Sequence, residues 1–328
     1  MKILITGSSG YIGSCCYEYF KHKFNIYGLD KTKPKVIKQR KFFHCNLLNY
    51  KKLNNILKVL KPDVIIHLAG QSTIDFINKK SDYLKNNNIA TKNLLKCINQ
   101  NNIRHLIFSS TAAVYESSTA LLKENSPIKP NNIYGQTKQK CEDYIFLNKK
   151  NQKNFNYIIF RFFNVCSSLA SLRIGELHDP ETHLVPILAN KFKNKETISI
   201  YGDDYKTNDG TCIRDYIHIL DIIIAFHKGI NYLENQKKSS VINLGSSIGF
   251  SCLEIFNKFK KYFPNQENVM FFIKKRKGDI SKLVCDNKKA FRLLNWKPKN
   301  SRINKIISDE LKWLELLNKK KIKRKTIY

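Results

Sequence analysis

Tyr134 and Lys138 stand four positions apart, a spacing that places both side chains on one face of a helix. A tyrosine hydroxyl is a poor base at neutral pH because its ordinary pKa is about 10, but a nearby ammonium group favours the phenolate. The pair is therefore a candidate acid–base group. Two unrelated residues on a solvated helix face are the plainer interpretation of the same spacing.

Hydroxyl side chains upstream of this pair favour the catalytic interpretation. Ser109, Ser110 and Thr111 stand at the end of an apolar run that starts at His105. Open α/β sheets bind their ligands beside the carboxyl ends of the strands. These hydroxyl groups are therefore expected to face a ligand.

The N-terminal region contains glycines at the spacing of a phosphate-binding loop. Gly7, Gly10 and Gly13 follow a short apolar run and open a helical stretch. Glycine permits a tight turn and a close approach of the backbone to a pyrophosphate, and the helix N-terminus supplies N–H donors. Asp30 ends the next apolar run, where an acid accepts hydrogen bonds from ribose hydroxyls and repels a 2′-phosphate, so NAD is favoured over NADP.

A parallel sheet would position these residues. Short apolar runs at 2–6, 25–30, 64–68 and 105–110 alternate with helical stretches, of which 51–60 and 82–100 would be crossover helices. Continuous β-rich runs separated by helices indicate strands that are buried on both faces. The predicted fold class is α/β, with a doubly wound parallel Rossmann sheet and a smaller C-terminal substrate-binding α/β domain.

The second half of the chain is less regular. Residues 164–180 look loop-like, 184–193 helical, and 201–211 are dense in Gly, Asp and Asn. We expect an NAD-binding domain over 1–165, a mainly substrate-binding domain over 166–318 from which segments can return to the first domain, and a basic tail over 319–328.

The chain is strongly basic, with 58 Lys and Arg against 26 Asp and Glu and a net charge of +32. The lysines are scattered and form a dense run only in the tail, so we interpret the charge as solvated and expect no nucleic-acid partner. A hydrophobic content of 42% excludes a disordered chain.

The cysteines and apolar segments bear on location. Nine cysteines include no CxxC pair and no cluster at zinc spacing, which favours reduced thiols, a cytoplasmic protein and no metal site. No apolar run approaches the length of a membrane span or a signal-peptide core, so we expect no membrane partner.

The sequence resembles the extended short-chain dehydrogenase/reductase family and, within it, the UDP-glucose 4-epimerases. The resemblance runs from the glycine loop to Trp296 and is most specific over 201–205 and 209–218. Segments 175–176, 179–184 and 276–279 are also similar to the family's segments around its uridine-diphosphate site.

The resemblance implies NAD as cofactor and a set of residues that contact it. Asn46 stands where the family usually has Asp, and Gln71 falls in a segment where many members carry a lysine. The implied cofactor residues are Gly7, Gly10, Tyr11, Ile12, Gly13, Asp30, Asn46, Leu47, Leu68, Ala69, Gly70, Asn87, Ser109, Tyr134, Lys138 and Phe163.

The resemblance also implies a UDP-sugar substrate and its epimerisation at C4. Tyr134 would take the proton of the 4-hydroxyl, Thr111 would bridge that hydroxyl, and Lys138 would hold Tyr134 deprotonated and bind the nicotinamide ribose. A 4-keto intermediate would then turn and take the hydride back on its other face. The implied substrate residues are Thr111, Phe162, Asn164, Leu184, Tyr201, Arg214, Arg276, Asp279 and Leu283.

Other functions stay open on the same residues. A related 4-epimerase acting on UDP-N-acetylhexosamines or UDP-pentoses would share them, whereas a dehydratase typically needs an acid pair where Ala112 and Ala113 follow Thr111. From a different class, the chain could be an inactive nucleotide-sensing regulator that binds nucleic acid. The family resemblance further implies a homodimer.

Overall fold

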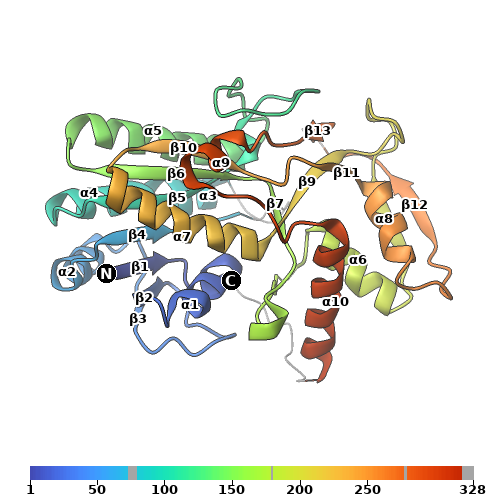
Figure 1. Ribbon diagram of the computed structural model, residues 1–328, viewed down its shortest axis with the longest axis horizontal. Coiled ribbons are helices and arrows are strands. Elements are labelled where there is room, and N and C mark those ends of the chain that lie inside the picture. The colour runs from blue at the N-terminus through green and yellow to red at the C-terminus, as the bar shows by residue number, and fades with distance from the viewer. Residues whose placement is uncertain (73–79, 179, 277–278, 320–328) are drawn as a thin grey trace.

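The computed structural model describes residues 1–72, 80–178, 180–276 and 279–319. The predicted basic tail therefore lies outside the described residues from position 320 onward. A large sheet with its helices fills the left half of Figure 1, and a smaller group of strands and helices fills the right half. Within these four ranges, no helix combines the length and apolar character needed to cross a membrane.

The large sheet is built from seven described strands, all paired in parallel. In order across the sheet they are β10 (Ser240–Leu244), β6 (Asn156–Phe162), β5 (His105–Thr111), β4 (Val64–His67), β1 (Lys2–Thr6), β2 (Asn25–Asp30) and β3 (Phe42–His44). The central strands are continuous apolar runs because helices cover both faces. The predicted doubly wound parallel sheet is confirmed.

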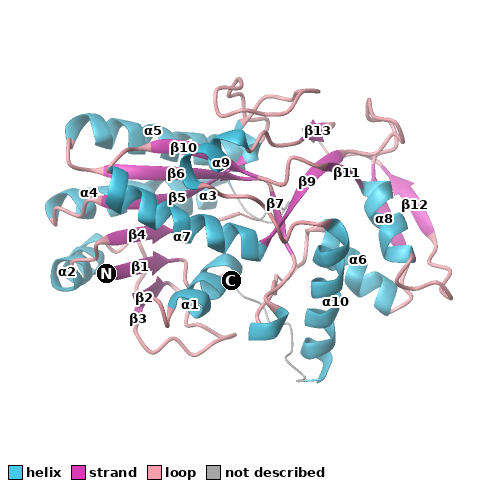
Figure 2. Cartoon of the chain, viewed as in Figure 1, coloured by secondary structure: helices cyan, strands magenta, loops and turns pink. Residues whose placement is uncertain are grey.

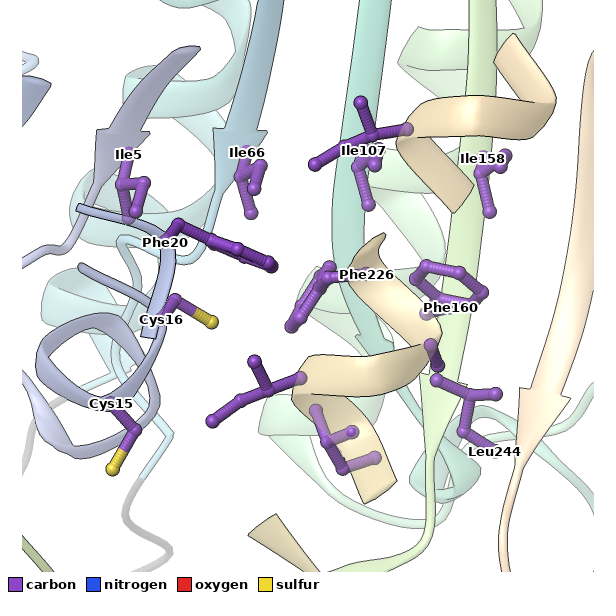
Figure 3. Packing of buried hydrophobic residues seen from close by; sticks show 14 of the residues in the cluster. Ile5, Cys15, Cys16, Phe20, Ile66, Ile107, Ile158, Phe160, Phe226 and Leu244 are labelled. Carbon is purple, nitrogen blue, oxygen red and sulfur yellow. The ribbon is translucent and has the colours of Figure 1, made fainter. Parts of the chain in front are cut away.

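Alternate side chains of the strands pack against helices on opposite faces. Ile3 and Ile5 of β1 join one buried cluster, while Leu4 joins the other. Helices α1 (Tyr11–Phe20), α7 (Ile219–Gln236) and α9 (Lys288–Leu294) cover the first face; α2 (Tyr50–Leu60), α4 (Ala90–Gln100) and α5 (Ile133–Asn151) cover the second. Figure 3 shows Phe20 and Phe226, from α1 and α7, over strand residues of the first cluster.

The predicted crossover helix over 82–100 contains an irregular turn. It consists of α3 (Lys80–Tyr83), the π-helical turn η1 (Leu84–Ile89) and α4. Within η1, Asn87 Nδ2 donates to Thr137 Oγ1 at 2.9 Å and Asn88 Nδ2 donates to the Thr137 carbonyl at 2.8 Å. The wider turn thus directs two amides toward α5, and π-helical turns of this kind are frequent at functional sites.

The described residues of the smaller region form two sheets with helices packed beside them (Figure 2). The sheets contain β7 (Asn164–Cys166), β9 (Ile213–His218), β11 (Gly249–Ser251) and β13 (Lys282–Leu283), and β8 (Ile198–Tyr201) with β12 (Met270–Ile273). Helices α6 (Leu184–Lys193), α8 (Cys252–Lys260) and α10 (Ile303–Lys319) share a buried core with them. The stretch predicted as loop-like over 164–180 therefore begins with a strand, because residues 164–166 pair with β9.

The chain returns to the large sheet late. Helix α7 packs on its first face, and β10 then pairs with β6 in parallel at the edge. Tyr115 strengthens this edge, since its hydroxyl donates to Asn243 Oδ1 of β10 at 2.6 Å. Residues 240–244 thus complete a sheet that begins at residue 2.

Candidate active site

A cavity of about 760 Å³ is lined by residues of both regions. The arrowheads of the central strands in Figure 2 point toward the smaller region, so the carboxyl ends of β1, β4 and β5 reach this cavity. Among the residues that the structure describes, the lining includes every residue assigned from the sequence to cofactor, substrate or catalysis except Asn87. The structure therefore brings together side chains from positions 7 to 283.

The glycine loop forms the wall of the cavity at the first turn of α1. Gly7 has φ +72°, and a Cβ there would lie 2.6 Å from the Ala69 nitrogen. A Cβ on Gly13 would lie 2.1 Å from the Gly7 carbonyl oxygen, whereas one on Gly10 would meet only that oxygen at 3.5 Å. Gly7 and Gly13 thus let backbone segments touch, and Gly10 leaves open space at the start of α1. A diphosphate fits this cradle.

Asp30 lies beside the loop at the end of β2. Its Oδ2 accepts from the Ser9 N–H at 3.0 Å, and its Oδ1 accepts from the Thr32 N–H at 3.0 Å. The carboxylate is thereby fixed at the cavity wall, next to Asn46 and Leu47. Besides the ribose contact expected from the sequence, Asp30 ties the glycine loop to the chain that follows β2.

Tyr134, Lys138 and Thr111 all line the cavity. Helix α5 starts at its N-cap Asn132, whose side chain accepts from the Gly135 N–H at 2.8 Å. This places Tyr134 in the first turn, where its hydroxyl is hydrogen-bonded to the Thr111 side chain. One turn later Lys138 Nζ donates to the Ser109 carbonyl at 2.7 Å.

Burial controls the acid–base properties of this pair. It raises the pKa of Tyr134 to about 12, against the lowering effect of the hydrogen bond from Thr111. It lowers the pKa of Lys138 to about 8, partly offset by Cys141 and Glu142. The Tyr134 phenol is therefore protonated at neutral pH in the protein alone. A further positive charge in the cavity would favour its phenolate.

Arg214 and Arg276 line the other end of the cavity. Arg214 Nη2 pairs with Asp279 Oδ1 at 2.5 Å, and Arg276 lies over the Tyr201 ring at 4.2 Å from its centroid. Asp279 Oδ2 also accepts from the Tyr205 hydroxyl at 2.9 Å. Both oxygens of Asp279 thus have protein partners, so this residue orients Arg214; it also lines the cavity, and its substrate contact stays a prediction. Residues 277 and 278 of the same segment lie outside the described residues.

Asn87 lies behind the cavity wall. Its Oδ1 accepts from the Gln71 N–H at 2.7 Å, and its Nδ2 donates to the Gln71 carbonyl at 3.2 Å and to Thr137 Oγ1 at 2.9 Å. With every polar atom of its side chain satisfied by protein, Asn87 holds the segment after β4 against α5. Gln71 itself lines the cavity.

A group of charged residues near Leu184 was missed by the sequence reasoning. Glu176 is buried, and its Oε1 lies 2.5 Å from His178 Nδ1 and 2.8 Å from His183 Nδ1. Glu181 Oε1 lies 2.9 Å from the same nitrogen of His183. Their spacing, Glu-x-His followed by a second Glu-x-His, was a signal in the sequence. Asp179, in the quoted segment, lies outside the described residues.

These contacts set the charges of the group. Burial would raise the pKa of Glu176, but the two histidines hold it at about 2. Burial would lower the pKa of His183, but Glu176 and Glu181 raise it well above its ordinary value. His183 is thus an imidazolium in the cavity lining. The ligand atoms of the four residues lie within 4.8 Å of one another and are of the types that hold a metal, and the second oxygen of the buried Glu176 carboxylate has no hydrogen-bond partner.

A nucleotide-cofactor cradle facing a Tyr–Lys pair at the carboxyl edge of a Rossmann sheet defines an α/β enzyme of nucleotide substrates. The chain belongs to the NAD dependent epimerase/dehydratase family, whose model matches residues 3–245. The resemblance found in the sequence and its implied dependence on NAD are thereby confirmed.

Individual relatives match almost the whole chain. It is 35% identical over 323 residues to a UDP-glucose 4-epimerase of Lacticaseibacillus casei, covering 96% of this chain and 97% of the relative. The structure of a UDP-glucose-4-epimerase of Stenotrophomonas maltophila, with bound NAD and formylated UDP-arabinopyranose, has a TM-score of 0.90 at 26% identity, covering 98% and 99%. A UDP-Glc/GlcNAc 4-epimerase of Campylobacter jejuni has a TM-score of 0.81 at 30% identity, covering 96% and 99%.

Proposed function

We propose that this chain is an NAD-dependent isomerase that interconverts UDP-glucose and UDP-galactose by inverting C4 of the sugar. One observation carries the proposal: a single cavity runs from the glycine cradle at Gly7 to the arginines Arg214 and Arg276, with Tyr134 between them. The names of the relatives support the same activity.

The cofactor end of the cavity suits NAD. The open space beside Gly10 and the free start of α1, which has no side-chain cap, suit a pyrophosphate. Asp30, held by Ser9 and Thr32, would bind the adenosine ribose, and Asn46 and Leu47 would lie near the adenine. When bound, NAD supplies a hydride acceptor and donor that is regenerated in each turnover.

The substrate end suits a nucleoside diphosphate. Guanidinium groups bind phosphate oxygens with paired N–H donors, and Arg214 is fixed for this by Asp279. Arg276 reaches the same cavity from a segment about sixty residues further along the chain. Phe162, Asn164, Leu184 and Tyr201 would flank the nucleotide, and Leu283 would line the sugar end.

Tyr134 would exchange a proton with the 4-hydroxyl of the sugar. Thr111 accepts from the Ala113 N–H at 3.1 Å, so its own proton is free to be donated to Tyr134 or to the sugar hydroxyl. Lys138, held by Ser109, supplies positive charge close to Tyr134 and favours the phenolate. Inversion follows when the oxidised sugar turns between proton removal and proton return.

Product identification tests this proposal. The purified chain, incubated separately with UDP-galactose, UDP-N-acetylgalactosamine and UDP-arabinose, is expected to convert the first to UDP-glucose with no net change in NAD. Proton NMR of the sugar anomeric signals identifies each product. Loss of water from the sugar would assign the chain to a different reaction. Conversion of UDP-N-acetylgalactosamine or UDP-arabinose without conversion of UDP-galactose would assign it to a different substrate.

The proposal includes a homodimer working in the cytoplasm. Leu84 and Ile89 of η1 and Leu147 of α5 are exposed apolar side chains on elements that pack against each other, which supports association through this pair of elements. Nine free thiols support a reducing compartment. Light scattering is expected to give twice 38.3 kDa, and Leu147→Glu is expected to halve that mass.

A further inference from the structure

Two cysteines lie side by side in the substrate end of the cavity. Cys212 Sγ and Cys252 Sγ are 3.4 Å apart, and both residues line the cavity. The antiparallel pairing of β9 with β11 ends at Ile213 opposite Ser251, and Cys212 and Cys252 are the next residues beyond this pair. The Cys252 N–H donates to the Cys212 carbonyl at 3.2 Å. The two backbones are thus held side by side at the end of a paired strand segment.

Bond formation needs only a small movement of the sulfur atoms. A disulfide has a sulfur–sulfur distance of about 2.05 Å, so the two sulfur atoms need to approach each other by about 1.4 Å. Cys212 is buried at the wall and Cys252 is partly exposed. A small oxidant that enters the cavity can therefore reach the pair.

The surroundings make Cys212 the reactive member of the pair. The hydrogen bond from Cys252 lowers the pKa of the Cys212 thiol, with further lowering by Arg214 and Arg276, against burial and the Asp279 carboxylate. The thiolate is the nucleophilic form of cysteine. A reactive thiol with a second cysteine beside it is the arrangement found in redox-sensitive proteins.

We propose that Cys212 and Cys252 form a reversible disulfide when the protein meets a peroxide, and that a nucleotide in the cavity slows its formation. The Cys212 thiolate attacks one peroxide oxygen, giving a sulfenic acid and hydroxide. Cys252 then attacks the sulfenic sulfur, the sulfur–oxygen bond breaks, and water leaves with the Cys252 proton. The two sulfurs lose two electrons to the peroxide, and a dithiol reductant restores both thiols.

The effect of the nucleotide rests on the proposed function. A diphosphate bound at Arg214 and Arg276 would neutralise the charges that favour the Cys212 thiolate and would block the path of the peroxide. The rate of disulfide formation should therefore fall in proportion to the fraction of occupied protein. The disulfide itself depends only on the geometry of the pair.

Thiol counting and peptide mapping test the proposal on the full chain. The reduced protein has nine thiols; after hydrogen peroxide and unfolding, seven are expected to remain, with one cross-linked peptide joining Cys212 to Cys252. Dithiothreitol should restore all nine. Nine unchanged thiols, or a cross-link between other cysteines, would overturn the proposal.

Variants separate the steps. Cys252→Ala should stop the reaction at a Cys212 sulfenic acid, which a cyclic diketone traps, and Cys212→Ala should leave Cys252 reduced. Cys97→Ala, outside the cavity lining, is the matched control and should form the disulfide at the parent rate. Absence of a trapped sulfenic acid in Cys252→Ala, or oxidation of Cys252 in Cys212→Ala, would contradict the roles assigned to the two cysteines. A slower rate in Cys97→Ala would show that the reaction is not confined to the pair.

A second arm repeats the oxidation with saturating UDP. Slower cross-linking supports the coupling to the cavity, and an unchanged rate overturns it. If the chain lacked epimerase activity but still formed the disulfide, the proposed function would fail while the thiol pair stood. If UDP-galactose were epimerised but no disulfide formed, the thiol proposal would fail while the proposed function stood.

Discussion

The two ends of the cavity are built from different parts of the polypeptide. At the cofactor end the wall is backbone: Gly7 and Gly13 bring main-chain segments so close that a Cβ would clash with the carbonyl oxygen or nitrogen of another segment. At the substrate end the wall is made of long side chains held by one another, with Asp279 between Arg214 and Tyr205.

This difference indicates which end of the cavity tolerates amino-acid substitutions. A backbone contact cannot be relieved by a new rotamer, so substitutions at the cofactor end disturb the fold itself. Side chains such as Arg276, in the segment after β12, and Leu283 of β13 can be exchanged while the backbone that carries them stays in place. The substrate end is therefore where a chain with this fold can alter its specificity.

The largest expected effect comes from the group between the two ends. Tyr134→Phe should reduce kcat about 10²–10⁴-fold, the usual contribution of a positioned acid–base group, and leave the binding of both nucleotides intact. Turnover of UDP-galactose and the amount of bound NAD are measured together. Parent-level turnover would exclude Tyr134 as the base.

Gly13→Ala tests the backbone end. The added Cβ would lie 2.1 Å from the Gly7 carbonyl oxygen, so we expect a loss of about 3 kcal/mol in the free energy of unfolding and loss of bound NAD. Gly10→Ala is the matched control, because its added Cβ would lie 3.5 Å from the Gly7 carbonyl oxygen, an ordinary van der Waals distance. Urea unfolding should show Gly10→Ala close to the parent; equal losses in both variants would contradict the backbone account.

Glu176→Gln tests a side-chain network by its pH dependence. Folding holds the pKa of Glu176 at about 2, below its ordinary value of 4.5, so its ionisation stabilises the protein above pH 4.5 and this stabilisation is lost as the pH falls toward 2. The variant should be about 2 kcal/mol less stable at pH 6, and the gap should narrow markedly by pH 3.5. Urea unfolding of parent and variant at both pH values measures the difference in the free energy of unfolding. An equal difference at pH 6 and pH 3.5 would show that Glu176 is not held ionised.

Arg214→Lys tests the geometry of the substrate end. A lysine keeps the charge but loses the fork that donates to Asp279 and to the Ile213 carbonyl, so KM for UDP-galactose should rise about tenfold with kcat less affected. Unfolding and NAD content should stay at the parent level. A loss of NAD with an unchanged KM would place Arg214 at the wrong end of the cavity.

Leu283 should give the smallest effect. It lines the cavity from β13, and its side chain is larger than that of serine and smaller than that of tyrosine. Leu283→Ser should raise, and Leu283→Tyr should lower, the kcat/KM for UDP-N-acetylgalactosamine relative to UDP-galactose by about fivefold, near the lower limit for small steric changes in a pocket. Equal ratios in all three proteins would mean that Leu283 packs the wall without selecting the sugar.

The sequence was most informative where function depends on local backbone. The glycine spacing after β1 and the Tyr134–Lys138 spacing on α5 predicted features that their own segments create, because turn and helix geometry follow from neighbouring residues. The parallel sheet was predictable for the same reason, since each strand is a continuous apolar run.

The partners of side chains were harder to predict. Asn87 was predicted to contact the cofactor, and this stays a prediction; its hydrogen bonds to Gln71 and Thr137 were not predicted, because they join segments far apart in the chain. The position of Cys252 beside Cys212 depends on a strand pairing over forty residues of separation, which no local pattern reports. Glu176 and His183 stood in two segments that resemble the family, but their mutual ionisation depends on contacts between these segments, which outweigh the opposing effect of burial.

The late return of β10 to the large sheet has a consequence for synthesis on the ribosome. Strand β6 ends at Phe162 and its neighbour β10 begins at Ser240, 78 positions further along the chain. At 5–20 residues per second the ribosome needs roughly 4–16 s to make this stretch. During that interval β6, with Ile158, Ile159 and Phe160, is an unpaired apolar edge that can join another nascent chain. A chaperone that binds extended apolar segments is therefore expected to engage the chain after β6 emerges and to leave once β10 pairs.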